Sequence, residues 1–123
     1  MGDDMPFAFE RTTLDSGIVV LALSGTMTMG NQLLQLEWAV QELTSNQPSS
    51  RIAMDMSQVT YVDSSAIGVL MGCNGLAKNS GGQMRVSGVN DRILTIFRIT
   101  QIDEVLRVDP NREASISALE AKA

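Results

Sequence analysis

The chain has 123 residues, which is the usual size of one domain. Hydrophobic residues make up 44% of the sequence, enough to bury a core and too many for a disordered or collagen-like chain. The formal net charge is −5 and the basic residues are scattered, so nucleic acid is not expected as a direct ligand. We therefore expect one domain over residues 1–123, with frayed ends at 1–5 and 121–123.

Two residue types are informative because they are rare or missing. The sequence has no histidine and a single cysteine, Cys73, which excludes nucleophile–histidine pairs, histidine metal ligands and an internal disulfide. The longest uninterrupted apolar run, Ile18–Leu23, is far shorter than the roughly twenty residues of a membrane helix. The start, Met1–Asp4, is acidic where a signal peptide would be basic. These features predict a cytoplasmic protein without membrane insertion.

The first half of the chain predicts a hairpin, a helix and a strand. Residues 7–13 carry Phe7 and Phe9 in alternation, and a turn cluster at 15–17 precedes the β-branched run 18–20, so we expect an opening β-hairpin. Residues 31–43 predict a helix, because four apolar residues follow the spacing of one helix face: Leu33, Leu36, Val40 and Leu43. A strand is expected at 51–56, followed by a loop that leads to Asp63 or Ser64.

The second half alternates helices with strands. A helix is expected at 64–79, ending before two glycines, and its core face is predicted to comprise Ala66, Leu70, Cys73 and Ala77, with Val69 and Leu76 beside it. Further elements are a strand at 83–87, a helix capped by Asn90 or Asp91, a strand at 105–108 and a helix at 111–121. The order is ββαβαβαβα, and strands that alternate with helices require parallel crossovers. The predicted fold class is α/β, with a mixed β-sheet covered by helices.

The most informative segment is Asp55–Gly68, which leads from a buried strand into a helix. The first backbone N–H groups of a helix lack partners within the helix, so hydroxyls and carboxylates at 63–65 suit that position. Helix capping alone explains these residue types.

The same segment resembles a known family signature. Asp55-Met56-Ser57 followed by Val62-Asp63-Ser64-Ser65-Ala66-Ile67-Gly68 is similar to the signature of the STAS domains, the anti-sigma-factor antagonists of bacteria. The resemblance continues through 81–86, 89–90, 93–97 and 102–103, and it implies the same ββαβαβαβα order. In that family the serine or threonine after the aspartate accepts a phosphoryl group from a partner kinase that is itself the anti-sigma factor. By resemblance, Ser64 is the phosphorylation site and Ser65 the runner-up.

The resemblance implies a binding module rather than an enzyme, without cofactor or metal. Unphosphorylated protein would bind an anti-sigma factor that is a serine kinase. Phosphorylation would end this binding, and a phosphatase would restore it. A homodimer is a further possible assembly. An alternative is a structural STAS subunit of a multi-protein signalling assembly or of a membrane-transport complex. A third interpretation, a small-molecule or nucleotide-binding domain, lacks the support of a phosphate loop in the sequence.

The helix after Ser64 carries a second stripe of small residues, at Gly68, Gly72 and Gly75. Each interior glycine destabilises a helix by about 1 kcal/mol relative to alanine, so three of them indicate close approach, either by another element of the domain or by a partner. The predicted partner-binding residues are Asp63, Ser64, Ser65, Ile67, Gly68, Met71, Gly72 and Gly75. A phosphate on Ser64 would be tolerated by the helix N-terminus, and Asp55 and Asp63 would repel it if both lie nearby.

Overall fold

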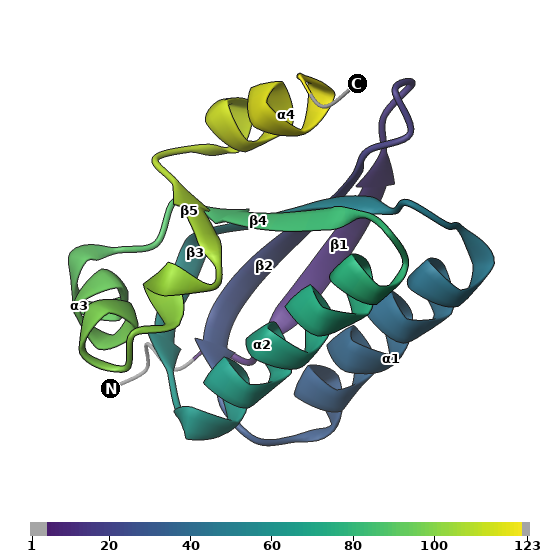
Figure 1. The fold of residues 1–123 in the computed structure, drawn as a ribbon. Coiled ribbons are helices and arrows are strands. Elements are labelled where there is room, and N and C mark those ends of the chain that lie inside the picture. Colours follow the sequence, from purple (N-terminus) through teal and green to yellow (C-terminus); the bar gives the residue numbers. More distant parts are fainter. Residues whose placement is uncertain (1–4, 122–123) are drawn as a thin grey trace.

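In the computed structural model, which describes residues 5–121, five strands form one mixed sheet in the order β1-β2-β3-β4-β5 (Figure 1). The strands are β1 Ala8–Thr13, β2 Val19–Met27, β3 Arg51–Val62, β4 Gln83–Ser87 and β5 Arg107–Asp109. β1 is antiparallel to β2, and every later neighbour is parallel. The predicted opening hairpin and parallel crossovers are confirmed.

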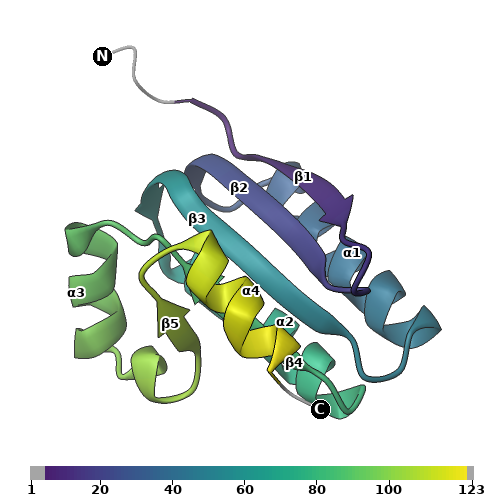
Figure 2. The same cartoon turned by 90° about the horizontal axis from the view of Figure 1, so that it is seen from above.

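The helices cover both faces of this sheet. They are α1 Asn31–Asn46, α2 Ser64–Asn79, α3 Asp91–Ile99 and α4 Arg112–Glu120, with a short 3-10 helix, η1, at Ile102–Glu104. Because successive strands are added in one direction, right-handed crossovers place α1 and α2 on the same face. α4 follows the last strand and covers the opposite face (Figures 1 and 2). The predicted order and fold class are confirmed, and no helix within residues 5–121 is long and apolar enough to cross a membrane.

The main core lies between the sheet and the pair α1 and α2. The four apolar residues predicted to form the inner face of the first helix are all buried, as are Ala66, Val69, Leu70, Cys73 and Ala77 of α2, whereas Leu76 is half-buried. Cys73 has no exposed surface, and this burial, with a smaller contribution from the carboxylate of Glu37, raises the pKa of its thiol to about 12. The thiol is therefore protonated and shielded at neutral pH.

The opposite face is more polar. A small apolar cluster lies there, consisting of Ile18, Val20, Ala53 and Leu119. Beside it, Arg85 donates two hydrogen bonds to Asp109, at 2.7 and 2.9 Å, and the buried Ser115 of α4 donates a third at 2.7 Å. Arg112 Nε donates to Asp55 Oδ2 at 2.8 Å. Ion pairs and a few apolar side chains therefore hold α4 on the sheet.

Three elements have boundaries that differ from the prediction by two residues or more. Residues 57–62, expected as a loop, continue β3 because they pair with the second half of β2, with register shifts on either side of Gly25. The last strand begins at Arg107 rather than Val105, because Val105 N and Leu106 N both donate to Ile102 O and so remain in a helical turn. α1 also extends past the predicted end at Leu43 to Asn46.

The predicted frayed ends lie largely outside the described residues, which exclude 1–4 and 122–123. Two residues of the predicted frayed ends, Met5 and Ala121, are described, and both form backbone hydrogen bonds. Met5 O accepts from the backbone N–H and the hydroxyl of Thr26, and Ala121 N donates to Ser117 O.

The two ion pairs beneath α4, Arg85–Asp109 and Arg112–Asp55, predict a contribution to stability that is lost in acid. Hydrogen bonds from Arg85 lower the pKa of Asp109. Burial raises the pKa of Asp55, but the hydrogen bonds that Asp55 accepts from Ser57 and Arg112 outweigh this effect, so its pKa is lowered too. Because both pKa values are lower in the folded chain, the stabilisation is complete above the ordinary pKa of 3.8 and is lost as pH falls below it. We expect Asp109→Asn to lower the free energy of unfolding by about 2 kcal/mol near neutral pH.

Urea unfolding at neutral and acidic pH tests this expectation. The difference between wild type and Asp109→Asn should shrink in acid, and Asp91→Asn, an exposed acid outside both ion pairs, serves as control. A deficit of Asp109→Asn that stays constant with pH would contradict the assignment.

Candidate functional site

The predicted site lies at the carboxyl end of β3, where the chain enters α2. Asp63 caps the helix, since its Oδ1 accepts from Ala66 N at 2.9 Å. The other oxygen, Oδ2, accepts from Met29 N at 3.1 Å, and the backbone N–H of Asp63 donates to Met27 O at 3.1 Å. One carboxylate therefore fastens the start of α2 to the loop between β2 and α1, and both of its oxygens are engaged within the chain.

Ser64 is exposed at the first residue of α2, and Ser65 is half-buried. The N–H groups of Ala66 and Ile67 are taken by the side chain and the carbonyl of Asp63. The N–H groups of Ser64 and Ser65 belong to the part of the first turn that has no acceptor within a helix. A phosphate on the Ser64 hydroxyl would therefore find backbone donors and the positive end of the helix dipole close by.

The glycine stripe of α2 divides between two environments. A Cβ added to Gly72 would lie 3.3 Å from Glu37 Oε2, so this glycine faces α1 within the domain. A Cβ added to Gly68 or Gly75 would meet no atom within 4 Å. Packing inside the domain therefore accounts for Gly72, whereas Gly68 and Gly75 open onto a free surface.

Apolar side chains border this surface. Ile67 and Met71 are half-buried and pack against the main core. Met29, whose side chain is 77% exposed, lies in the loop that Asp63 holds. Sequence reasoning missed Met29, because only the hydrogen bond across 34 positions brings it to the start of α2.

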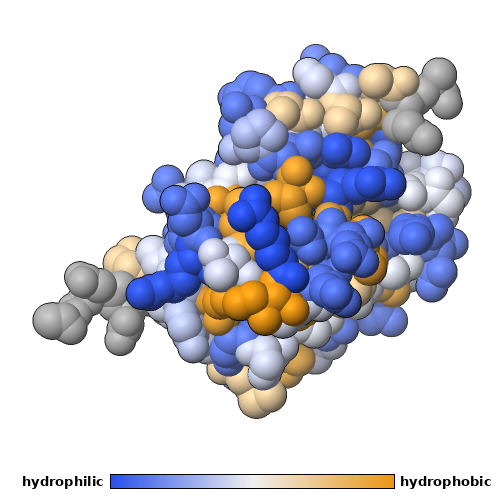
Figure 3. Space-filling view, turned by 60° about the vertical axis from the view of Figure 1, so that its left-hand side comes forward, coloured by the Kyte–Doolittle hydropathy of each residue, from blue (hydrophilic) through white to orange (hydrophobic). Residues whose placement is uncertain are grey.

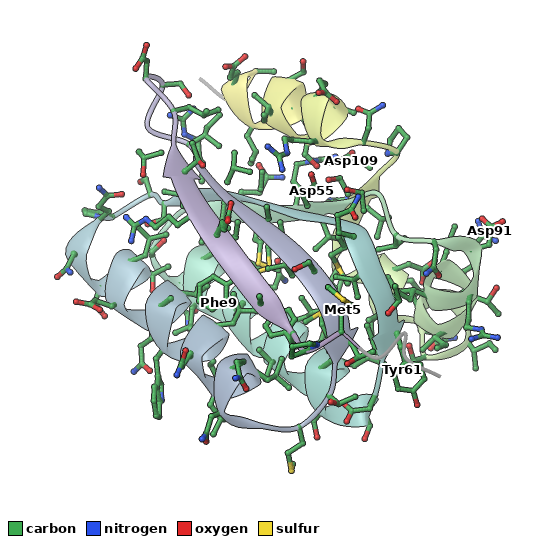
Figure 4. The ribbon with its side chains drawn as sticks, turned by 180° about the vertical axis from the view of Figure 1, so that it is seen from behind. Met5, Phe9, Asp55, Tyr61, Asp91 and Asp109 are labelled. Atoms are coloured by element: carbon green, nitrogen blue, oxygen red, sulfur yellow. The ribbon has the colours of Figure 1, made fainter. Side chains whose placement is uncertain are left out.

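Asp55 does not contribute to the site. It precedes Asp63 by eight residues on an extended strand, a separation on the order of 25 Å. Figure 4 shows Asp55 and Asp109 beneath α4, and Tyr61 toward the other end of β3. The expectation that Asp55 lies near a phosphate on Ser64 and repels it is therefore wrong. Asp55 lies far from Ser64 and forms an ion pair with Arg112.

Loss of the Asp63 carboxylate should destabilise the domain. Asp63→Ala removes the cap and the link to Met29, and we expect the free energy of unfolding to fall by about 1–2 kcal/mol. Asp91→Ala is the matched control, because Asn90 and not Asp91 caps α3. Urea denaturation measures both variants, and equal stability of the two would show that the anchor is unimportant.

The sequence is similar to one protein family and to named bacterial proteins. A family model described as "Mlab, STAS domain" matches residues 11–108. The anti-sigma-B factor antagonist of Bacillus subtilis is 25% identical over 61 residues, which span 50% of this chain and 56% of that protein. The anti-sigma F factor antagonist of Paenibacillus polymyxa is 23% identical over 107 residues, covering 85% of this chain and 88% of the relative.

The fold is similar to that of solved structures. An anti-sigma factor antagonist from Mycobacterium paratuberculosis superimposes with a TM-score of 0.80 at 18% identity, covering 94% of this chain and 95% of that one. The match of the family model to most of the sequence, together with the observed strand order, shows that the chain belongs to the STAS domain family.

Proposed function

We propose that this chain is an anti-sigma factor antagonist whose binding to its partner is switched by phosphorylation of Ser64. The observation that carries the proposal is the exposed hydroxyl of Ser64 at the first residue of α2, directly after the anchored Asp63. Family membership and the names of the two antagonists from Bacillus subtilis and Paenibacillus polymyxa support the proposed function as an anti-sigma factor antagonist.

In the unphosphorylated state, the exposed side of α2 binds the partner, an anti-sigma factor that is also a serine kinase. Gly68 and Gly75 let the partner's backbone approach closely, because neither position has an atom near its missing Cβ. Met29, exposed beside Asp63, supplies apolar contact area next to Ser64. The anti-sigma factor, occupied in this way, releases its sigma factor. These partners act in the cytoplasm, where we expect the protein to work.

Phosphorylation ends the binding without unfolding the domain. The kinase transfers a phosphoryl group from ATP to the Ser64 hydroxyl, which adds about −1.5 to −2 charges beside the fixed carboxylate of Asp63. Backbone donors at the start of α2 stabilise this charge in the free protein. A docked partner would have to bury it, so the complex is destabilised while the fold persists. A phosphatase then restores the binding form.

Mass spectrometry of protein purified from its source cells tests the phosphorylation site. We expect wild type and Ser65→Ala to carry one phosphoryl group, and Ser64→Ala to carry none. A phosphate that remains on Ser64→Ala, or a wild type that is never modified, would contradict the assignment, and the second result would favour a structural STAS subunit.

Substitution of Gly68 separates docking from stability. Gly68→Gln has room in the free domain and should raise the free energy of unfolding by up to about 1 kcal/mol, because glycine is a poor helix former. The same change should abolish capture of an anti-sigma factor kinase from source-cell extract by immobilised protein. Ser117→Gln, on the exposed side of α4, is the control that should keep capture. Undiminished capture by Gly68→Gln would remove this surface from the proposal.

A further inference from the structure

A cavity of about 700 Å³ opens where the parallel strands β3, β4 and β5 begin. Its walls come from the second half of α2, the first residues of β4, and the segment that joins η1 to β5. Cavities of this size hold small organic ligands. The cavity lies at the amino ends of the strands, whereas Ser64 follows the carboxyl end of β3. Lys78 in its wall is fourteen residues along α2 from Ser64, about 21 Å of helix.

The walls of the cavity are positively charged, although the whole chain is acidic. Three basic residues line it, Arg51, Lys78 and Arg107, against one acid, Glu104. The two ion pairs of the described residues use Arg85 and Arg112, so no acid within salt-bridge distance neutralises Lys78 or Arg107. Arg51 is partly engaged, since its guanidinium donates to the carbonyls of Ser16 and Leu119. Lys78 and Arg107 are therefore the cations available to an anion.

Two amide side chains in the wall provide hydrogen-bonding groups. Gln83 Oε1 is buried without a hydrogen-bond partner in the described part of the chain, which is costly for an acceptor shielded from water. Asn74, on the inner side of α2, is only 5% exposed and also lines the cavity. A hydroxyl group of a ligand would satisfy this oxygen once the Gln83 side chain turned toward the cavity. Met84 and Val105 add an apolar wall against which its carbon skeleton can pack.

Apolar side chains are also exposed on this side of the molecule. Figure 3 shows apolar side chains between strongly hydrophilic ones on the side of the molecule that carries α3 and β5. Val105, 45% exposed, belongs both to the exposed apolar residues and to the cavity wall. Cations, an unsatisfied acceptor and apolar side chains thus line one open cavity.

We propose that this cavity is a binding site for a small organic anion that carries hydroxyl groups, the chemistry shared by sugar phosphates and sugar acids. Lys78 and Arg107 bind the anionic group, and the Gln83 carbonyl oxygen, turned toward the cavity, accepts from a hydroxyl. The site is independent of the proposed switch at Ser64, because it uses the other end of α2.

An NMR titration of protein labelled with a nitrogen isotope tests the site. The probes are glucose 6-phosphate, gluconate and inorganic phosphate. Glucose 6-phosphate or gluconate should bind saturably and shift the backbone amides of 81–84 and 105–107, and should bind more tightly than inorganic phosphate. Lys78→Glu and Arg107→Glu should each weaken binding about tenfold, since each reverses a charge that contacts the anion. Both side chains are exposed, so the fold should survive.

Two further variants complete the test. Arg92→Glu, the same charge change at an exposed site outside the cavity, should bind like wild type. Gln83→Met, which removes the acceptor at similar volume, should weaken binding severalfold without lowering stability. The proposal is overturned if the organic probes cause no shift of these amides at millimolar concentration. It is equally overturned if they bind no better than inorganic phosphate, or if the charge reversals leave binding unchanged.

Discussion

The arrangement of the candidate site depends on the two hydrogen bonds accepted by the Asp63 carboxylate. One oxygen caps α2 and the other holds the loop that precedes α1, so a single side chain joins the ends of β2 and β3 to the start of two helices. Asp63 is thereby occupied, and Ser64 is left as the exposed polar group at the helix start. The capping function and the proposed signalling function are thus divided between neighbouring residues, and the second depends on the first for the position of Ser64 and Met29.

Much of the fold could be predicted because its elements differ in hydrophobic period and are separated by turn residues. The bounds of α2 and β4 agree with the predicted ones, since Asp63 and the pair Gly81-Gly82 mark the ends of α2. The continuation of β3 through residues 57–62 could not be predicted, because it depends on pairing with β2 across register shifts. Polar residues such as Ser57 and Gln58 predict a loop when the sequence is taken alone, and they form a strand only because β2 lies beside them.

The candidate site was predicted in part. Asp63, Ser64 and Gly68 lie together at the start of α2 because they are close in sequence, so local reasoning sufficed. The absence of Asp55 from this place and the presence of Met29 depend on tertiary contacts: Arg112 holds Asp55 under α4, and Asp63 brings in Met29. The cavity at the other end of α2 has no sequence signature at all, because its walls come from segments separated by loops and strands.

We propose that a phosphate on Ser64 acts at a fixed helix start and leaves the rest of the domain unchanged. NMR spectra of the protein with and without a phosphoryl group on Ser64 test it most directly. We expect the changes in backbone chemical shift to be confined to residues 28–30 and 62–68, around the hydrogen bonds of Asp63. Changes that extend through β4, β5 and α4 would contradict it, because phosphorylation would then act by rearranging the domain rather than by altering its binding surface.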